Sequence, residues 1–187
     1  MDRRIVKTKK AIRQAFSSLI KEKPIEEITV SELSEKADID RRTFYLHYSA
    51  IIDITTEIEN EAVAELNALV AQNTNCDLAL FIECLNQILL NNFDYYQCIT
   101  STLSYYRFQK ECAKILKTAL TRTFFSQSGL PAETFDFYAE YVTAGIMAVY
   151  IKWVNSDQKC SIEELSETVL SAVRESWQQI TGKKENA

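Results

Sequence analysis

Apolar residues recur every three or four positions along most of the chain, which is the spacing of one face of an α-helix. The pattern predicts a first helix over residues 4–22, ended by Pro24. Later helices are predicted over residues 50–72, 77–91, 94–101, 104–127, 132–154 and 162–181. The chain has only three glycines and two prolines, and its clearest break is the segment 129–131. We therefore expect an all-α fold of long helices and short connections.

Two short helices between residues 22 and 50 are predicted from local capping chemistry. Thr29 with Glu32 three positions later forms a capping box, and Asp40 is expected to cap the following helix. The segment 37–39 between them leaves room only for a sharp corner. A helix, a short turn and a second helix of this size are typical of a helix-turn-helix motif.

The second of these helices has its polar residues at its start. Arg41, Arg42 and Thr43 are its first residues, where a recognition helix contacts base edges. Phe44 and Tyr48 lie four residues apart and are expected to share the inward face. An isolated pair of arginines is more often an ordinary solvated surface. The ordered set of cap, turn, second cap and outward polar face favours DNA binding.

Charge is distributed unevenly along the chain. Residues 1–50 contain eleven basic and eight acidic residues, an excess of three positive charges. Because the whole chain has a formal net charge of −5, residues 51–187 carry −8. This distribution indicates that only the N-terminal part meets a polyanion. No apolar run approaches the ~20 residues of a membrane span, and the first residues are unlike a signal peptide, so we expect a soluble, cytoplasmic protein.

The residue types argue against an enzyme or a metal protein. There is one histidine, no glycine loop that could hold phosphate and no nucleophile elbow. His47 and the scattered cysteines lack the spacing of metal ligands. The five cysteines form no Cys-x-x-Cys pair and are interpreted as small buried hydrophobic residues. We expect no enzymatic activity, no cofactor and no metal.

Specific residues within the region 5–65 resemble the TetR/AcrR family of transcriptional regulators. The matching residues are Ile28-Thr29-Val30, Leu33, Ala37, Ile39, Thr43-Phe44-Tyr45-Leu46-His47-Tyr48 and Asp53-Ile54. Gly145 and the segment 146–153 are similar to a common pattern in the second half of the family. The resemblance implies a helix-turn-helix DNA-binding domain over residues 1–49, a helical effector-binding and dimerisation domain over 50–182, and a frayed tail over 183–187.

The resemblance also implies which residues contact DNA. It places Thr29 and Ser31, in the first helix of the motif, at positions of phosphate and base contacts. Arg41, Arg42 and Thr43, at the start of the second helix, would read bases. Tyr45 and His47, near its end, would contact phosphates, and Leu46 would contact a base edge or a thymine methyl.

The chain departs from the family pattern at three positions. Asp38 replaces the usual turn glycine, and aspartate tolerates unusual backbone angles. Ile51 and Ser49 replace lysines that are common at the start of the fourth helix, which weakens the expected phosphate contact there. We predict that the basic N-terminus takes over part of that role, through Arg3, Arg4, Lys7 and Lys10.

Helix 132–154 is apolar on more than one face, so it should be buried on more than one face. A two-fold dimer explains this pattern and is the family's usual arrangement; the alternative is a core helix in a monomer. The residues expected at the interface are Tyr138, Tyr141, Val142, Gly145, Val149, Leu165, Val169, Val173 and Trp177.

Aromatic residues concentrate between positions 93 and 153, where family members often bind a small effector. Tyrosines can line such a cavity, although aromatic residues at helical spacing are more often plain core. The candidates are Tyr105, Phe108, Phe124 and Tyr141.

Together these observations predict a dimeric repressor that binds a palindromic operator, with half-sites ~34–36 Å apart or a multiple of that spacing. A small molecule would release it from DNA. The alternative is a TetR-like regulator or co-activator that acts through a protein partner, with weak or no direct DNA binding.

Overall fold

The computed structural model of the chain describes residues 3–72, 78–100 and 103–182. These residues form helices and no β-strand, which confirms the all-α prediction. The elements are α1 (Arg3–Leu19), the short 3-10 helix η1 (Ile25–Glu27), α2 (Val30–Lys36), α3 (Arg41–Tyr45), α4 (Ile52–Gln72), α5 (Leu78–Asn91), α6 (Phe93–Ile99), α7 (Leu103–Ser128), α8 (Ala132–Val154) and α9 (Ile162–Thr181). None of the described helices is both long enough and apolar enough to cross a bilayer.

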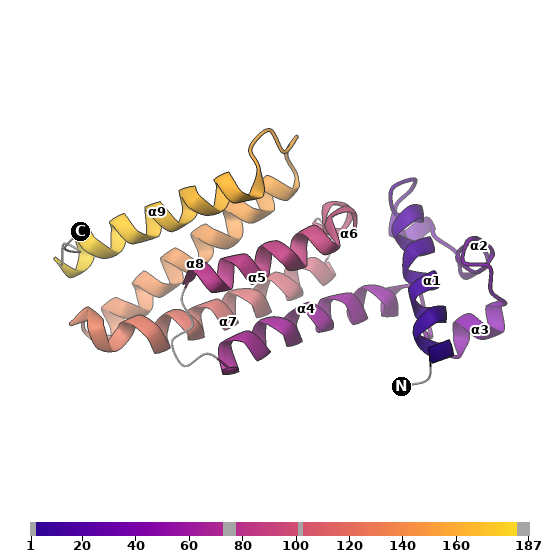
Figure 1. The fold of residues 1–187 in the computed structure, drawn as a ribbon, viewed down its shortest axis with the longest axis horizontal. Coiled ribbons are helices and arrows are strands. Elements are labelled where there is room, and N and C mark those ends of the chain that lie inside the picture. Colours follow the sequence, from indigo (N-terminus) through magenta and orange to yellow (C-terminus); the bar gives the residue numbers. More distant parts are fainter. Residues whose placement is uncertain (1–2, 73–77, 101–102, 183–187) are drawn as a thin grey trace.

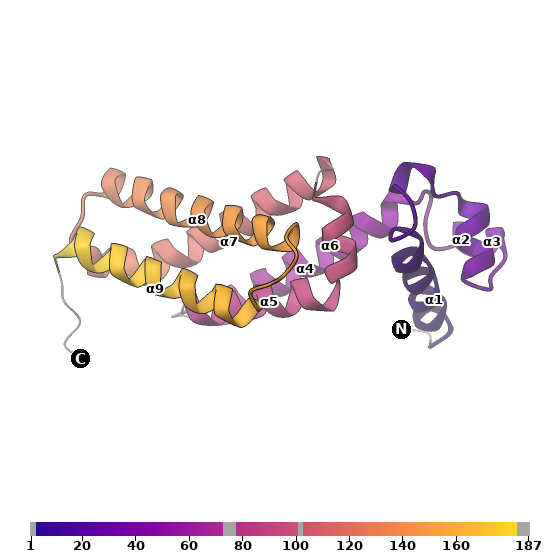
Figure 2. The same ribbon diagram turned by 90° about the horizontal axis from the view of Figure 1, so that it is seen from above.

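The molecule is elongated, with two parts of different size (Figure 1). Helices α1–α3 form a small head at one end, and α4–α9 form a larger body; Figure 2 shows the same division from above. Helix α4 begins next to the head and runs through the body. Helix α7 packs along α4 and along α8, and α5 packs against α4 and α9. The body is therefore continuous with the head through α4.

The head has its own apolar core. Ile12 and Phe16 of α1, Leu33 of α2 and Phe44 of α3 are all at most 1 % exposed. Helices of five and seven residues are too short to be stable alone in water. Their stability therefore depends on packing these side chains against α1.

Local chemistry positions the motif, with one exception to the prediction. The Thr29 hydroxyl accepts the Glu32 amide hydrogen at 3.2 Å, and Asp38 has a φ of 54°, the left-handed conformation that its side chain tolerates. The expectation of a side-chain cap from Asp40 is wrong, because that side chain caps no amide of α3. Instead the Phe44 amide donates to the Asp40 backbone carbonyl at 3.1 Å, and burial of Phe44 holds the helix start.

A buried polar network joins three helices of the body. The Tyr150 hydroxyl of α8 donates to Asn86 Oδ1 of α5 at 2.8 Å. Asn86 Nδ2 donates to the Ser166 hydroxyl of α9 at 2.8 Å. Buried polar groups are costly unless they are paired, so this network favours one relative position of α5, α8 and α9.

The cysteines are only partly as predicted. Cys112 is buried and Cys84 is partly buried, but Cys98 and Cys160 are exposed, so the prediction of burial is wrong for these two. Both lie where helices end, Cys98 in the last turn of α6 and Cys160 directly before α9. Cys76 lies outside the described residues. Within the described residues no group of His, Cys, Asp and Glu side chains could hold a metal ion.

Candidate nucleic-acid interface

Helix α3 has one face in the core of the head and one face in solvent. Phe44 and Tyr48 are buried, with ring centroids 5.7 Å apart. Arg41 and Arg42 are exposed at the start of the helix. Leu46, directly after the helix, is 74 % exposed. This outward face offers guanidinium donors beside an apolar group, the two chemistries that read base edges and thymine methyls in a major groove.

The other predicted contact residues of the motif surround this face. Tyr45 is about half exposed, whereas Thr43 and His47 are partly buried. Thr29 and Ser31, at the start of α2, are exposed. The Thr29 hydroxyl accepts the Glu32 amide hydrogen, yet it keeps its own hydrogen for donation to a phosphate.

The basic residues of α1 belong to two groups. Arg3, Arg4, Lys7 and Lys10, the residues predicted to contact phosphate, are exposed. Lys9 and Arg13 are instead partly buried and form ion pairs with α4. Sequence reasoning did not single out this second group, although its four-residue spacing places both side chains on one face of α1.

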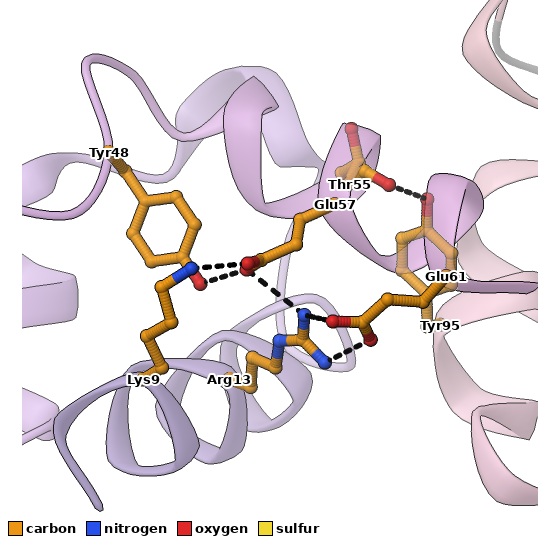
Figure 3. Close-up of polar contacts among 7 residues, drawn as sticks. All are labelled: Lys9, Arg13, Tyr48, Thr55, Glu57, Glu61 and Tyr95. Atoms are coloured by element: carbon orange, nitrogen blue, oxygen red, sulfur yellow. Dashed lines mark hydrogen bonds and ion pairs between the residues drawn. The ribbon is translucent and has the colours of Figure 1, made fainter. Parts of the chain in front are cut away.

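These ion pairs form a cluster that we call the head–body clamp: Lys9, Arg13, Tyr48, Glu57 and Glu61 (Figure 3). Two guanidinium nitrogens of Arg13 bond the two carboxylate oxygens of Glu61 at 2.7 Å each. Arg13 Nη2 also lies 3.0 Å from Glu57 Oε2. Glu57 additionally accepts hydrogen bonds from Lys9 Nζ and from the Tyr48 hydroxyl. The clamp thus joins α1, and Tyr48 three residues after α3, to the second and third turns of α4.

The clamp is charged at neutral pH. Burial raises the pKa of Glu57, but the hydrogen bonds from Lys9, Tyr48 and Arg13 outweigh it and lower the pKa to about 2. The pKa of Tyr48 is raised well above its usual value, mainly by burial and secondly by the hydrogen bond to Glu57. The hydrogen bond to Glu61 is the main cause that raises the pKa of Arg13. Glu57 is therefore an anion held by two cations and a phenol.

Helix α6 is a second connection between body and head. The ring centroid of Tyr95 lies 6.3 Å from that of Phe16 in the head. The Tyr95 hydroxyl donates to Glu59 Oε1 of α4 at 2.9 Å. Lys21 Nζ, just after α1, lies 2.6 Å from Asp94 Oδ2 of α6. The head is therefore in contact with both α4 and α6.

The start of α4 has no cation. The Asp53 carboxylate accepts the backbone amides of Ser49 at 2.6 Å and Ala50 at 3.0 Å, so it caps this helix start. Ile51 packs partly buried against the core, and Ser49 is exposed. The exposed cations of the head lie elsewhere, among them those of α1 and of the start of α3.

The predicted dimer residues divide by burial. Tyr141, at 71 %, Gly145 and Val149 are exposed on one face of α8. The remaining predicted residues face the inside of the same protomer: Val142, Leu165 and Val169 are buried, and Tyr138, Val173 and Trp177 are partly buried. Sequence reasoning missed Phe137, which is 68 % exposed one helical turn before Tyr141.

The four aromatic residues predicted to line one effector site do not share a cavity. Tyr105 and Phe108 lie together, with ring centroids 6.1 Å apart. Phe124 packs instead against Trp177 of α9, at 5.2 Å. Tyr141 points to solvent from the outer face of α8.

Comparison with known proteins supports a regulator. The family model for the C-terminal region of TetR-type transcriptional regulators matches residues 77–175. An uncharacterised helix-turn-helix transcriptional regulator of Bacillus subtilis (strain 168), YxbF, is 34% identical over 67 residues. That match covers 35% of this chain, and the chain spans only 18% of the relative's length.

Two solved structures have a similar fold. The dihydroxyacetone kinase operon activator DhaS has a TM-score of 0.71 and 21% identity, over 92% of this chain and 97% of that one. The TetR family repressor AlkX from Dietzia sp. strain DQ12-45-1b has a TM-score of 0.50 and 12% identity, over 91% and 98%. At these identities the likeness shows the fold alone.

The clamp predicts a pH-dependent loss of stability. Glu57→Gln keeps the shape of the side chain but removes its charge, so we expect the free energy of unfolding at pH 7 to fall by about 1–3 kcal/mol. Because the pKa of Glu57 is lowered in the folded state, its contribution is fully present above pH 4.5 and is lost as the pH falls toward 2. The unfolding free energy of the variant should therefore fall less steeply than that of the wild type over this range.

Chemical denaturation monitored by circular dichroism between pH 7 and pH 2.5 measures both effects. Glu65→Gln is the matched control, because Glu65 lies exposed on the same helix. An equal fall in the free energy of unfolding for Glu57→Gln and Glu65→Gln would contradict a stabilising clamp.

Proposed function

Because this chain belongs to the TetR family of transcriptional regulators, we propose that it binds DNA sequence-specifically as a two-fold dimer. In this proposal residues 1–49 are the DNA-binding domain and residues 50–182 the regulatory and dimerisation domain. The observation that carries it is the outward face of α3, where Arg41, Arg42 and Leu46 are exposed on a helix anchored by Phe44. A rigidly held helix with donors at its start can enter a major groove in one register.

The proposed contacts divide into base reading and phosphate binding. Arg41, Arg42 and Thr43 read bases from the start of α3, and Leu46 contacts a thymine methyl or base edge. Phosphates are bound by Thr29, Ser31, Tyr45 and His47 of the motif. Phosphate contacts fix register and carry no sequence information themselves, so specificity depends mainly on the two arginines.

The exposed cations of α1 supply the phosphate contacts that the start of α4 lacks. Arg3, Lys7 and Lys10 recur at helical spacing, so they share one face of α1. Arg4 is exposed beside them. Lys9 is excluded from this role because Glu57 holds it in the clamp.

The proposed dimer forms through the exposed face of α8. Phe137 and Tyr141 are large and exposed, and the small residues Ala144, Gly145 and Ala148 continue the same face toward the C-terminal end. A Cβ atom added at Gly145 would meet no other atom of its own protomer within 4 Å, apart from its own helix backbone. An apolar face with small residues at its centre allows a second helix to approach closely, which favours a two-fold interface between copies of α8.

The proposed release from DNA would use the same geometry. We infer that the protein acts as a repressor that a small-molecule effector removes from its palindromic operator. An effector that displaces α4 would move the head with it, because the clamp holds both. A coupling of about 1–3 kcal/mol would suffice for regulation.

One observation keeps a second function open. No cation lies at the start of α4, where Ser49 and Ile51 stand, so phosphate contacts there are weaker than in a typical family member. A regulator that acts through a protein partner, with weak direct DNA binding, would tolerate weaker phosphate contacts at the start of α4. Selection of operator sequences from random DNA with the purified protein separates the two functions, because only a direct DNA reader enriches a palindrome.

The phosphate contacts of α1 predict a change in salt dependence. Replacing Arg3 and Arg4 with alanine should flatten the plot of log affinity against log salt by about one unit for each lost contact. Fluorescence anisotropy with the selected operator, from low to moderate salt, measures the slope. The control removes two exposed lysines of the body, Lys114 and Lys159, and should leave the slope unchanged. An unchanged slope in the first variant would remove α1 from the phosphate contacts.

Arg42 predicts a change in base preference. Arg42→Ala should cost roughly 1–3 kcal/mol at the base pair that it reads and leave other positions unaffected. Binding to a panel of operators with single base changes measures this pattern. A uniform loss across the panel would assign Arg42 to phosphate instead.

The α8 face predicts a change in oligomeric state. Gly145→Glu places a charge at the centre of the apolar face without a clash inside the protomer, so we expect a folded monomer where the wild type is a dimer. Sedimentation velocity at micromolar concentration measures the mass, and circular dichroism checks the helix content. Ala68→Glu, at an exposed small residue of α4, should remain dimeric. A dimeric Gly145→Glu protein would place the interface elsewhere.

A further inference from the structure

The body contains a cavity of about 340 Å³. Its lining residues come from the start of α5, the end of α7, the start of α8 and the end of α9. These parts of the helices lie away from the head (Figure 1). Small-molecule sites in proteins begin at roughly this size. No residue of α3 lines the cavity, and neither do Phe137, Tyr141 or Gly145 of the outer face of α8.

The walls of this cavity are mainly apolar and aromatic. Phe124 and Tyr138 both contact Trp177, with ring centroids at 5.2 and 5.7 Å. Leu78 and Leu120 are buried behind them. The hydroxyl of Tyr138 is hydrogen-bonded toward α9, so the tyrosine offers its ring rather than its polar tip. These walls suit the apolar body of a ligand.

One cation lies at the edge of the cavity. Arg174 lines it and is exposed, and it is the only basic residue in α9. No ion pair or side-chain hydrogen bond among the described residues involves its guanidinium group. Its own helix cannot supply a partner, because none of the residues three or four positions away is acidic: Leu170, Ser171, Trp177 and Gln178.

We propose that this cavity binds an amphipathic carboxylate. The apolar part of the ligand lies against Phe124, Tyr138 and Trp177, and its carboxylate pairs with Arg174. Arginine binds carboxylates through two parallel N–H donors, so it fixes the orientation of the ligand as well as its charge. A cationic amphiphile would meet repulsion at the same point.

The larger cavity at the head–body junction, of about 440 Å³, has a different character. Its walls include Glu26, Glu59 and Glu111 against the single cation Arg107. An excess of carboxylates disfavours an anionic ligand. Arg107 therefore provides a matched control for Arg174: it is the same residue type at the edge of a competing cavity.

The regulatory meaning of the site rests on the proposed function. The ligand would contact Tyr138 of α8 and Trp177 of α9 and would lie against α7, which packs along α4. Filling the cavity would shift these helices relative to one another and change the separation of the two heads. Carboxylate binding itself requires neither a dimer nor DNA.

The test uses decanoate as the probe, below its micellar concentration, with decanol and decylammonium as matched neutral and cationic amphiphiles. Isothermal titration calorimetry measures affinity. Fluorescence reports on Trp177, since the only other tryptophan, Trp153, lies outside the cavity with its indole N–H bonded to the Cys160 carbonyl. We expect one decanoate per chain, with binding of decanol about tenfold weaker and of decylammonium weaker still.

Two variants locate the carboxylate. Arg174→Gln should reduce decanoate affinity about tenfold and leave decanol affinity unchanged, because only the charge-assisted contact is lost. Arg107→Gln should bind decanoate like the wild type. Ala79→Phe, at an exposed position on the edge of the cavity, should weaken both decanoate and decanol while circular dichroism stays unchanged.

Three results would overturn the proposal: no saturable decanoate binding, equal affinity for decylammonium, or unchanged decanoate binding by Arg174→Gln. A parallel titration of operator DNA distinguishes this failure from failure of the proposed function. A protein that binds decanoate through Arg174 but enriches no operator would retain the carboxylate site and refute the DNA-binding proposal. A protein that binds operator but not decanoate would retain the DNA-binding proposal and refute the carboxylate site.

Discussion

The position of the head on α4 depends on Arg13, which lies between two carboxylates of that helix. Its guanidinium group pairs with Glu61 through two hydrogen bonds and with Glu57 through an ion pair. Glu57 is partly buried, so breaking its ion pair with Arg13 would leave the Glu57 carboxylate poorly solvated, which costs more than never forming the pair. The head therefore keeps one orientation on α4 as long as these charges remain paired. A rotation of α4 would therefore move the head together with α4.

Helices rather than loops connect the remote parts of the molecule to the clamp. Helix α7 contributes Leu120 and Phe124 to the distal cavity and packs along α4, whose second and third turns carry Glu57 and Glu61. Helix α6 contacts the head independently through Tyr95 and Phe16. A displacement of α4 relative to α6 would thus strain two connections at once. Packed helices respond to such strain by moving between discrete positions, which is the requirement for a switch.

Most of the fold could be predicted from the sequence because its determinants are local. The limits of α8 and α9, the cap at Thr29 and the left-handed turn at Asp38 each depend on residues a few positions apart. The clamp could not be predicted in this way, because Arg13 and Glu61 are 48 residues apart and their pairing depends on the direction in which α4 leaves the head. The sequence also does not show what an apolar helix face packs against. The helical spacing that includes Val142 is the same whether that face packs inside its own protomer or against another, and the structure shows Val142 buried inside its own protomer.

The two groups of basic residues on α1 explain how a chain without a lysine at the start of α4 could still couple that helix to DNA. Arg3, Lys7 and Lys10 share one face of α1, and Lys9 and Arg13 lie about a third of a turn away, against α4. If the first group binds phosphates, then the second connects the same helix directly to Glu57 and Glu61. Helix α1 would then transmit between DNA and α4 what a lysine on α4 transmits directly. The absence of a lysine there is compatible with the proposed regulation as long as the clamp is intact, so substitutions in the clamp would change operator affinity although the proposed phosphate contacts lie outside it.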